Sequence, residues 1–252
     1  FVTMLPYKEN FFVTWLDGRN TVEKEGEERG AMTIRAAEVL PTGEIGKETE
    51  LDARTCDCCQ TTAAITADGP VVIYRDRSED EIRDISIVRQ LGGEWTAPKS
   101  VYDDNWKING CPVNGPKAAS MNNTLVIAWF SAANGRAEVK VIFSADNGEN
   151  FDAPIGLSKL NSIGRVDVAL LDENTVIASY MESNKSRAQL KAVKVTRSGE
   201  ISNPVLVTDL DGSRKSGFPQ MEVVNDKVLF AWTEVVEEST AVKMAQVMVD
   251  SF

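Results

Sequence analysis

Residues 113–157 read VNGPKAASMNNTLVIAWFSAANGRAEVKVIFSADNGENFDAPIGL, and this stretch decides the fold. It contains four short apolar runs that are rich in β-branched and aromatic residues. Each run is bounded by Gly, Asn, Asp or Ser. Strands favour the first set of residues, and tight turns favour the second. The stretch therefore predicts a four-stranded antiparallel meander.

The same pattern recurs about every 50 residues along the chain. An aromatic residue closes the second predicted strand of each unit, and a Gly-Glu pair marks the turn between the third and fourth strands. The aromatic residues are Trp15, Tyr74, Trp129, Tyr180 and Trp232, and the pairs are Gly43-Glu44, Gly93-Glu94, Gly148-Glu149 and Gly199-Glu200. Four-stranded units at this period are typical of propeller blades. The sequence thus predicts an all-β fold, a β-propeller of four-stranded antiparallel blades.

We expect a single propeller domain over residues 1–252, with blades at about 1–53, 54–104, 105–159, 160–210 and 211–252. The fifth unit ends after its third predicted strand. A propeller closes its ring to remove exposed sheet edges. We therefore expect the chain to be the C-terminal part of a longer protein with six or more blades, whose missing strand or blades come from the same precursor.

Composition excludes several classes of function. The chain has 27 Lys and Arg against 38 Asp and Glu, a net charge of -11, and such an acidic surface repels nucleic acid. No apolar run of ~18 residues predicts a transmembrane segment. There is no histidine, which excludes Ser-His-Asp and Cys-His catalysis. We expect no cofactor and no catalytic metal.

The charge run at residues 23–29 predicts a solvated loop.

Unusual polar residues gather at one predicted end of the units. In a meander, the loop after the second strand and the connection into the next unit emerge at the same end. Two positions past the aromatic residues lie Asp17, Asp76, Ser131, Glu182 and Glu234, and the loops and connections at that end add Arg19, Arg75, Arg77, Arg165, Arg214 and Lys215. Arginines hold carboxylates, and carboxylates bind sugar hydroxyls or act as acid and base. This rim predicts a site for an anionic or polyhydroxylated ligand; the alternative is that these residues cap turns or face solvent.

The cysteines form a second predicted cluster. Cys56, Cys58, Cys59 and Cys111 all map to the connections that enter the second and third units, so they should be neighbours. Two disulfides, in an oxidising compartment, are one prediction. A four-thiolate metal site and free reactive thiols are the alternatives. The metal site is disfavoured because adjacent Cys58 and Cys59 would point to opposite sides of a strand.

One segment resembles a known structural motif. Residues 144–151, SADNGENF, are similar to the Asp-box, Ser-x-Asp-x-Gly-x-x-Trp, with Phe151 in place of the tryptophan. The motif recurs in sialidase propellers. The resemblance implies that Ser144, Asp146, Gly148 and Phe151 stabilise a turn on the face opposite the active site.

Longer segments extend the resemblance to nearly the whole chain. Residues 52–61, 74–78, 110–116 and 164–170 are similar to bacterial sialidase-like proteins with BNR repeats, which are usually labelled exo-alpha-sialidase by homology. Sialidases use an arginine triad, an aspartate acid/base, and a tyrosine nucleophile paired with a glutamate. The resemblance implies a triad from Arg75 or Arg77 with Arg165 and Arg214, an acid/base at Asp76 or Asp17, and a nucleophile pair at Tyr180 and Glu182. The carboxylate rim adds Glu234 as a predicted substrate-binding residue.

These observations predict a sialidase-like glycoside hydrolase that acts on a carboxylated sugar. We expect it to be secreted, periplasmic or at the cell surface of a bacterium, with a carbohydrate as its partner. The first alternative is a non-catalytic propeller that binds a glycan or a partner protein through the same face. The second is a metal or redox site at the cysteine cluster.

Overall fold

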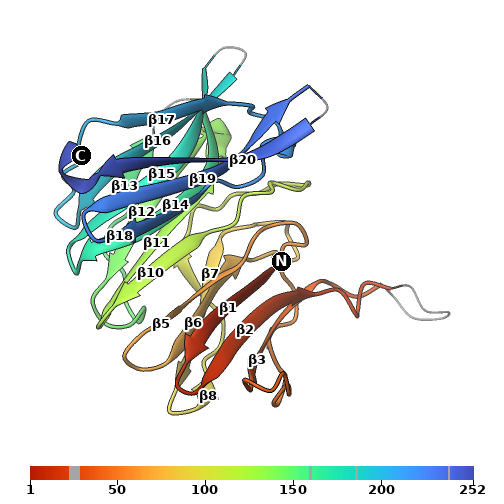
Figure 1. Cartoon of the computed structure of the whole chain (residues 1–252). Coiled ribbons are helices and arrows are strands. Elements are labelled where there is room, and N and C mark those ends of the chain that lie inside the picture. The colour runs from red at the N-terminus through yellow and green to blue at the C-terminus, as the bar shows by residue number, and fades with distance from the viewer. Residues whose placement is uncertain (23–28, 159–160, 185–186, 238) are drawn as a thin grey trace.

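The computed structural model describes residues 1–22, 29–158, 161–184, 187–237 and 239–252 (Figure 1). The predicted loop at residues 23–29 therefore lies outside the described residues, apart from Arg29. Five antiparallel sheets follow one another in chain order, from the first, in red, to the fifth, in blue (Figure 1). Apart from short 3-10 turns, the described chain is all β. The prediction of an all-β propeller is confirmed, and the sheets are not closed into a ring by β-pairing.

The sheets are meanders in which consecutive strands pair. The first contains β1 (Val2–Tyr7), β2 (Asn10–Asp17), β3 (Thr33–Val39) and β4 (Thr49–Asp52). The second contains β5 (Thr62–Ile65), β6 (Pro70–Arg75), β7 (Ile85–Leu91), β8 (Glu94–Trp95) and β9 (Lys99–Tyr102), and both β8 and β9 pair with β7. The third contains β10 (Lys117–Met121), β11 (Thr124–Ser131), β12 (Glu138–Ser144) and β13 (Ile155–Ser158).

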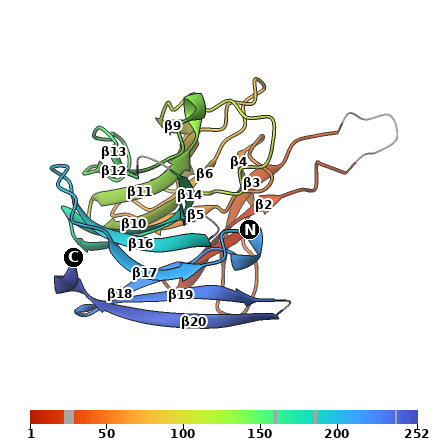
Figure 2. The ribbon, with the colours of Figure 1, turned by 90° about the horizontal axis from the view of Figure 1, so that it is seen from above.

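The last two sheets follow the same plan. The fourth contains β14 (Ser162–Asp172), β15 (Thr175–Asn184), β16 (Arg187–Thr196) and β17 (Val205–Leu210). The fifth contains β18 (Gln220–Val224), β19 (Lys227–Val236) and β20 (Ser239–Met248), with β20 at its outer edge (Figure 2). The 3-10 turns are η1 (Ala133–Gly135), η2 (Arg214–Ser216) and η3 (Val249–Ser251). Among the described residues, no helix has the length and hydrophobicity needed to cross a membrane.

The core lies between neighbouring sheets. Every residue of β11 is buried, because its side chains alternate between two partners. Ile127 and Trp129 pack with residues of the second sheet, whereas Val126 and Phe130 pack with residues of the fourth. Similar clusters join the first sheet to the second and the fourth to the fifth. Burial of one large apolar side chain contributes roughly 1.5 to 3 kcal/mol, so these interfaces hold the sheets face to face.

The first strands of the five sheets line a common cavity of about 680 Å³. Residues of β1, β5, β10, β14 and β18 all contribute to its wall, and consecutive first strands contact each other from β1 to β18. This cavity is the axial channel of the propeller. The connections that enter the sheets therefore meet around one end of it.

The turn at residues 144–151 is held by its own side chains. Ser144 Oγ accepts the N–H of Gly148 at 2.9 Å, and Asp146 Oδ1 accepts the N–H of Asn150 at 2.8 Å. Gly148 has a φ of 82°, and a Cβ there would lie 2.9 Å from Ile87 and Leu125. Phe151 packs against the core between the second and third sheets. These contacts hold the turn in place.

Arg75 joins the second and third sheets as a buried cation. Its side chain is 1% exposed, and it donates to the carbonyl oxygens of Asn114 at 2.9 Å, Arg83 at 2.6 Å and Phe130 at 2.6 Å. Its guanidinium also lies over the Trp106 ring, 4.9 Å from the centroid. Arg75 therefore satisfies three backbone acceptors that come from different parts of the chain.

Replacing Arg75 should destabilise the fold strongly. In Arg75→Met the three buried carbonyl groups lose their donor, and we expect the free energy of unfolding to fall by about 3 to 5 kcal/mol in urea denaturation. The matched control is Arg136→Met, whose side chain is 75% exposed and which should change stability by less than about 0.5 kcal/mol. Equal losses in the two variants would contradict this role for Arg75.

Candidate functional site

A pocket of about 400 Å³ opens where the first strands begin, at one end of the axial channel. We call it the mouth pocket. It shares Thr3, Lys117 and Gln220 with the wall of the channel, so the two spaces are adjacent. Its other lining residues include Phe1, Gln60, Thr61, Asn114, Gly115, Arg165 and Phe218.

Arg165 enters this pocket from a distorted part of β14. The backbone has φ values of 85° at Gly164 and 55° at Arg165, and the pairing of β14 with β15 shifts register there. Asn114 fixes this conformation, because its Oδ1 accepts the N–H of Arg165 at 2.9 Å and its Nδ2 donates to Ile163 O at 3.0 Å. A Cβ at position 164 would lie 2.4 Å from Asn114 Oδ1. Glycine is therefore required at this position.

The guanidinium of Arg165 is buried without a counterion. The residue is 6% exposed, and its guanidinium lies 4.2 Å from the centroid of the Phe218 ring. Within the described residues, no hydrogen bond or ion pair reaches this guanidinium, and Nη1 is a buried donor without an acceptor. Burial, followed by the charge of Arg214, lowers the pKa of Arg165. An anion bound here would relieve both the unfilled donor and the uncompensated charge.

Two more unpaired polar atoms lie on the same pocket. Gln60 Oε1 accepts the N–H of Gly115 at 3.0 Å, which leaves Gln60 Nε2 buried without a partner. The hydroxyl of Thr61 is also buried and unpaired. Across the described part of the chain, three of the six such atoms belong to residues of the mouth pocket. Buried polar groups are nearly always paired, so this concentration points to a ligand.

A carboxyl group lies in the channel wall beside the pocket. Asp167, on β14, is 6% exposed and accepts the N–H of Met221 at 2.8 Å. Lys117 Nζ lies 3.8 Å from Asp167 and also donates to Gln220 at 3.0 Å. Burial raises the pKa of Asp167. A group with a raised pKa stays protonated at a higher pH, as a proton donor requires.

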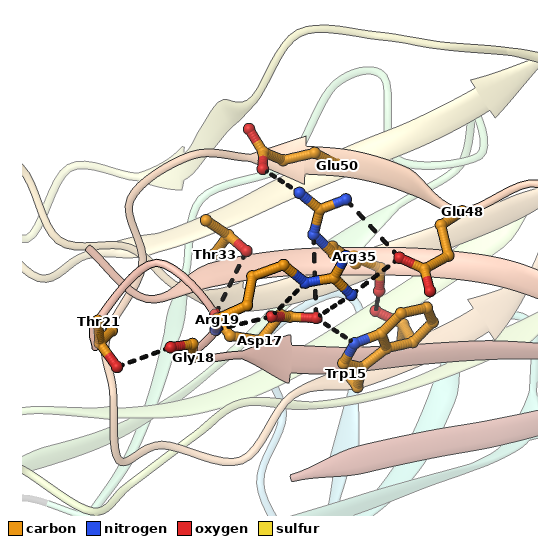
Figure 3. Close-up of polar contacts among 10 residues, drawn as sticks. Trp15, Asp17, Gly18, Arg19, Thr21, Thr33, Arg35, Glu48 and Glu50 are labelled. Carbon is orange, nitrogen blue, oxygen red and sulfur yellow. Dashed lines mark hydrogen bonds and ion pairs between the residues drawn. The ribbon is translucent and has the colours of Figure 1, made fainter. Parts of the chain in front are cut away.

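Asp17, a predicted acid/base, is instead part of a closed polar cluster in the first sheet (Figure 3). Its carboxylate accepts from Arg19 Nε at 2.8 Å, Arg19 Nη2 at 2.6 Å and Trp15 Nε1 at 2.9 Å. Arg35 lies on its other side, 3.9 Å away. The hydrogen bonds from Arg19 hold the pKa of Asp17 well below its ordinary range. This geometry favours a structural anion over a proton donor.

The repeated carboxylates have similar partners in other sheets. Glu234 accepts from Trp232 Nε1 at 3.3 Å, and Glu182 pairs with Lys191 at 2.8 Å. A basic residue stands directly opposite four of the aromatic residues, in the pairs Trp15–Arg35, Trp129–Lys140, Tyr180–Lys191 and Trp232–Lys243. In the first, fourth and fifth sheets the repeated carboxylate thus pairs with residues of its own sheet.

The predicted nucleophile pair and the second acid/base candidate lie away from the mouth pocket. Tyr180 is 2% exposed in the core between the third and fourth sheets, and burial raises its pKa to about 12. Asp76 follows β6 and is half-buried. Burial, together with Asp52 and Asp84, raises the pKa of Asp76 to about 6. None of the residues that line the mouth pocket is Tyr180, Glu182 or Asp76.

The predicted arginine triad is only partly assembled. Arg75 is committed to backbone carbonyls, and Arg77 is paired with Glu81 at 2.7 Å and Asp57 at 3.1 Å. Arg214 is exposed, lies close enough to Arg165 to affect its pKa, and donates to Cys111 O at 3.1 Å. The structure therefore brings together Arg165 and Arg214. Sequence reasoning missed Gln60, Lys117, Asp167, Phe218 and Gln220, although each lies at or near the start of a first strand.

The sulfurs of Cys56, Cys58 and Cys59 lie within 4.8 Å of one another, and all four cysteines are free thiols. Cys56 Sγ lies 3.3 Å from Cys59 Sγ and 3.9 Å from Cys58 Sγ, and Cys111 is close enough to Cys58 to affect its pKa. A hydrogen bond from Cys59 lowers the pKa of Cys58 to about 5. The contact with Cys59 also lowers the pKa of Cys56 to about 7.

Comparisons with known proteins identify the fold alone. No family model matches the chain, and no curated protein matches its sequence. The hemagglutinin-neuraminidase of parainfluenza virus 5, solved with the ligand DANA, has a TM-score of 0.51 and 6% identity over 95% of this chain and 75% of that chain. The catalytic domain of the GH62 alpha-L-arabinofuranosidase of Coprinopsis cinerea has a TM-score of 0.50 and 11% identity over 98% and 89%.

Another similar structure is longer than this chain. The Hadza microbial sialidase Hz136 has a TM-score of 0.48 and 13% identity, and the match covers 86% of this chain and 53% of that chain. The chain thus spans about half of that sialidase.

The low pKa of Asp17 predicts a defined pH dependence of stability. A carboxylate whose pKa is depressed in the folded state stabilises the fold fully above its unfolded pKa of about 3.8, and loses this contribution as the pH falls toward its folded pKa. Asp17→Asn should therefore lower the melting temperature equally at about pH 7 and pH 5, and by less at about pH 3.

The control for this measurement is Asp68→Asn, an exposed carboxylate in the turn between β5 and β6. It should leave the melting temperature unchanged at all three pH values. A deficit for Asp17→Asn that grows below about pH 4 would contradict a structural anion at this position.

Proposed function

We propose that this chain is a sialidase-like propeller of the glycoside hydrolase type, and that it binds a carboxylated sugar in the mouth pocket. The proposal rests on the unpaired buried donors that line this pocket. Among these donors in the described chain, the guanidinium of Arg165 is the one that is charged. A sugar carboxylate supplies the charge and the acceptors that Arg165 lacks, and sugar hydroxyls are partners for Gln60 and Thr61.

The chemistry of the pocket suits one anionic sugar. A guanidinium binds a carboxylate through two parallel N–H donors, and this geometry selects a planar anion. Arg214 adds a second positive charge close to Arg165, although the chain as a whole has a net charge of -11. Lys117 and Gln220 add polar groups where the pocket meets the channel. The pocket is thus a local cationic site on an acidic protein, and it should prefer acidic over neutral sugars.

The similar structures support a sugar substrate. The viral hemagglutinin-neuraminidase and the fungal arabinofuranosidase both carry names of carbohydrate-binding or carbohydrate-cleaving proteins, and a third similar structure, from Parabacteroides distasonis, is described as a putative glycoside hydrolase, with a TM-score of 0.50. Their identity to this chain is too low to indicate its substrate, so we infer the substrate class from the residues of the mouth pocket.

For hydrolysis we assign the proton donor to Asp167 and its carboxylate partner to Glu222. Both line the axial channel, on the neighbouring first strands β14 and β18, and glycoside hydrolases use such a carboxyl pair. Burial raises the pKa of Asp167, and the negative charge of Glu222 raises it further. Asp167 therefore has the character of the acid, and Glu222 that of the base or nucleophile.

A second candidate function is sugar binding without turnover. It is favoured because Asp167 already accepts the N–H groups of Val168 and Met221, and because no carboxylate among the described residues lines the mouth pocket itself. If the chain binds sugar without turnover, Arg165 still holds the sugar carboxylate, but Asp167 and Glu222 have no catalytic role. The two functions are therefore separated by variants at these positions.

Arg165→Gln should weaken binding of an acidic glycoside about 10- to 100-fold, because a charge-assisted pair is lost, and should leave binding of neutral glycosides unchanged. Isothermal titration with a panel of acidic and neutral glycosides measures this. Arg197→Gln is the matched control, because Arg197 pairs with Asp152 outside the pocket. Wild-type affinity of Arg165→Gln for every acidic glycoside would refute the proposed site.

Turnover is tested separately with fluorogenic acidic glycosides. If the chain is a hydrolase, Asp167→Asn should lose turnover and keep the affinity for the acidic glycoside. If it only binds, neither the wild type nor Asp167→Asn releases the fluorophore, whereas the Arg165→Gln effect on affinity remains.

A further inference from the structure

The four cysteine sulfurs gather at the point where the second and third sheets begin. The sulfurs of Cys56, Cys58 and Cys59 all lie within 4.8 Å of one another. Cys111 arrives from the next connection along the chain, and its sulfur lies outside this group of three but close enough to the Cys58 thiol for each to affect the pKa of the other. The chain has four cysteines in all.

The local backbone explains how adjacent cysteines can share one site. The sequence disfavoured a metal on the assumption that Cys58 and Cys59 lie in a strand, where their side chains would point apart. The structure has a turn at residues 57–58 instead, so that assumption is wrong. The N–H of Cys56 is bonded to Arg75 O at 3.0 Å, which anchors the start of this turn to β6.

The surroundings of the cluster are those of ligating thiolates. The backbone N–H groups of Cys58 and Val113 lie close enough to the sulfurs of Cys56 and Cys58, respectively, to lower the pKa of each thiol. Val113 has a φ of 50°, which is strained for a β-branched residue and is held here by its neighbours. Such donors around sulfur orient metal ligands and spread their negative charge.

Positive charge is also built in around the sulfurs. Arg83 is 4% exposed, and its Nη1 donates to Cys56 Sγ at 3.3 Å. Arg75, also buried, lies close enough to affect the Cys59 thiol. Four thiolates around a divalent ion carry a net charge of about -2. Arg83 also pairs with Glu81 at 2.7 Å, so the guanidinium of Arg75 is the one that offsets part of that charge without a carboxylate partner in the described chain.

We propose that Cys56, Cys58, Cys59 and Cys111 bind one Zn²⁺ ion in a closed, structural site. Zinc takes four thiolates in a tetrahedron with Zn–S bonds of about 2.3 Å, which places the sulfurs about 3.8 Å apart. The separations of 3.3 and 3.9 Å at Cys56 bracket this value. The chain has no histidine, so thiolates are the soft ligands available.

The ion would join two connections that are far apart in sequence. Cys59 directly precedes Gln60 and Thr61, and Cys111 lies three residues before Asn114, which fixes the backbone of Arg165. Gly115 packs so closely on Gln60 that a Cβ at position 115 would lie 2.0 Å from Gln60 O. The zinc site therefore clamps the two segments that form one side of the mouth pocket.

The test uses the full chain, purified without chelator and under reducing conditions. Elemental analysis should find one zinc per chain. After removal of zinc, titration with Co²⁺ should give thiolate-to-cobalt charge transfer and the visible bands of a tetrahedral ion, and Zn²⁺ should displace them. Competition with a chromophoric chelator should show that Cys58→Ser and Cys111→Ser bind zinc at least about 100-fold more weakly than the wild type.

The matched control is Asp57→Asn. Asp57 lies between Cys56 and Cys58, but its carboxylate pairs with Arg77 at 3.1 Å. This variant should keep the zinc affinity of the wild type within about twofold, because the carboxylate is not a ligand. Added zinc should raise the melting temperature of the wild type and of Asp57→Asn, and not that of Cys58→Ser.

Two disulfides in the purified protein, mapped by non-reducing mass spectrometry, combined with no cobalt charge transfer after reduction, would overturn the proposal. Undiminished zinc affinity in both Cys58→Ser and Cys111→Ser would also overturn it. These outcomes do not depend on the sugar, because Arg165→Gln should bind zinc like the wild type.

Discussion

The packing of both faces of each inner sheet against its neighbours is the constraint on which the rest of the structure depends. β11 shows it most clearly, since all its residues are buried and alternate side chains serve the second and the fourth sheets. Sheets stacked in this way place their first strands around one channel. Gln60, Asn114, Arg165 and Phe218 belong to four different sheet entries, and they meet only because of that arrangement.

The fold could be predicted from the sequence because every unit meets the same requirement. Each second strand needs β-branched and aromatic residues on one or two buried faces, so the pattern repeats and is visible without coordinates. The repeated carboxylates also serve their own sheets, and for this reason their positions did not predict the mouth pocket. Asp17 and Glu234 accept indole N–H groups within their own sheets, and Glu182 pairs with the lysine on the neighbouring strand. The carboxylates that recur along the chain stabilise individual sheets. The mouth pocket is instead lined by a different residue from each unit.

The two buried arginines show what the sequence could not reveal. Arg75 and Arg165 both lie near the ends of strands in segments that resemble sialidase-like proteins, and nothing in their neighbours along the chain separates them. In the structure, Arg75 donates to three carbonyl oxygens, two of which lie 39 and 55 residues away in sequence. Arg165 has no such acceptor in the described chain. A buried guanidinium is structural or functional according to its acceptors, and these come from other units.

The cysteine cluster and the mouth pocket are coupled through Cys59, Gln60 and Thr61. The thiol of Cys59 faces the other sulfurs, while the next two residues hold two of the unpaired donors of the pocket. Thiolates without a cation would place negative charge near Arg75 and Arg165, where Cys59 is already close enough to affect both electrostatically. That charge would oppose an incoming sugar carboxylate. A divalent ion at the sulfurs removes half of it and fixes the turn, so the donors of Gln60 and Thr61 are held in place before the ligand arrives. A bound divalent ion thus reduces the negative charge that thiolates would place near Arg165, and it leaves more of the field of Arg165 to act on the ligand.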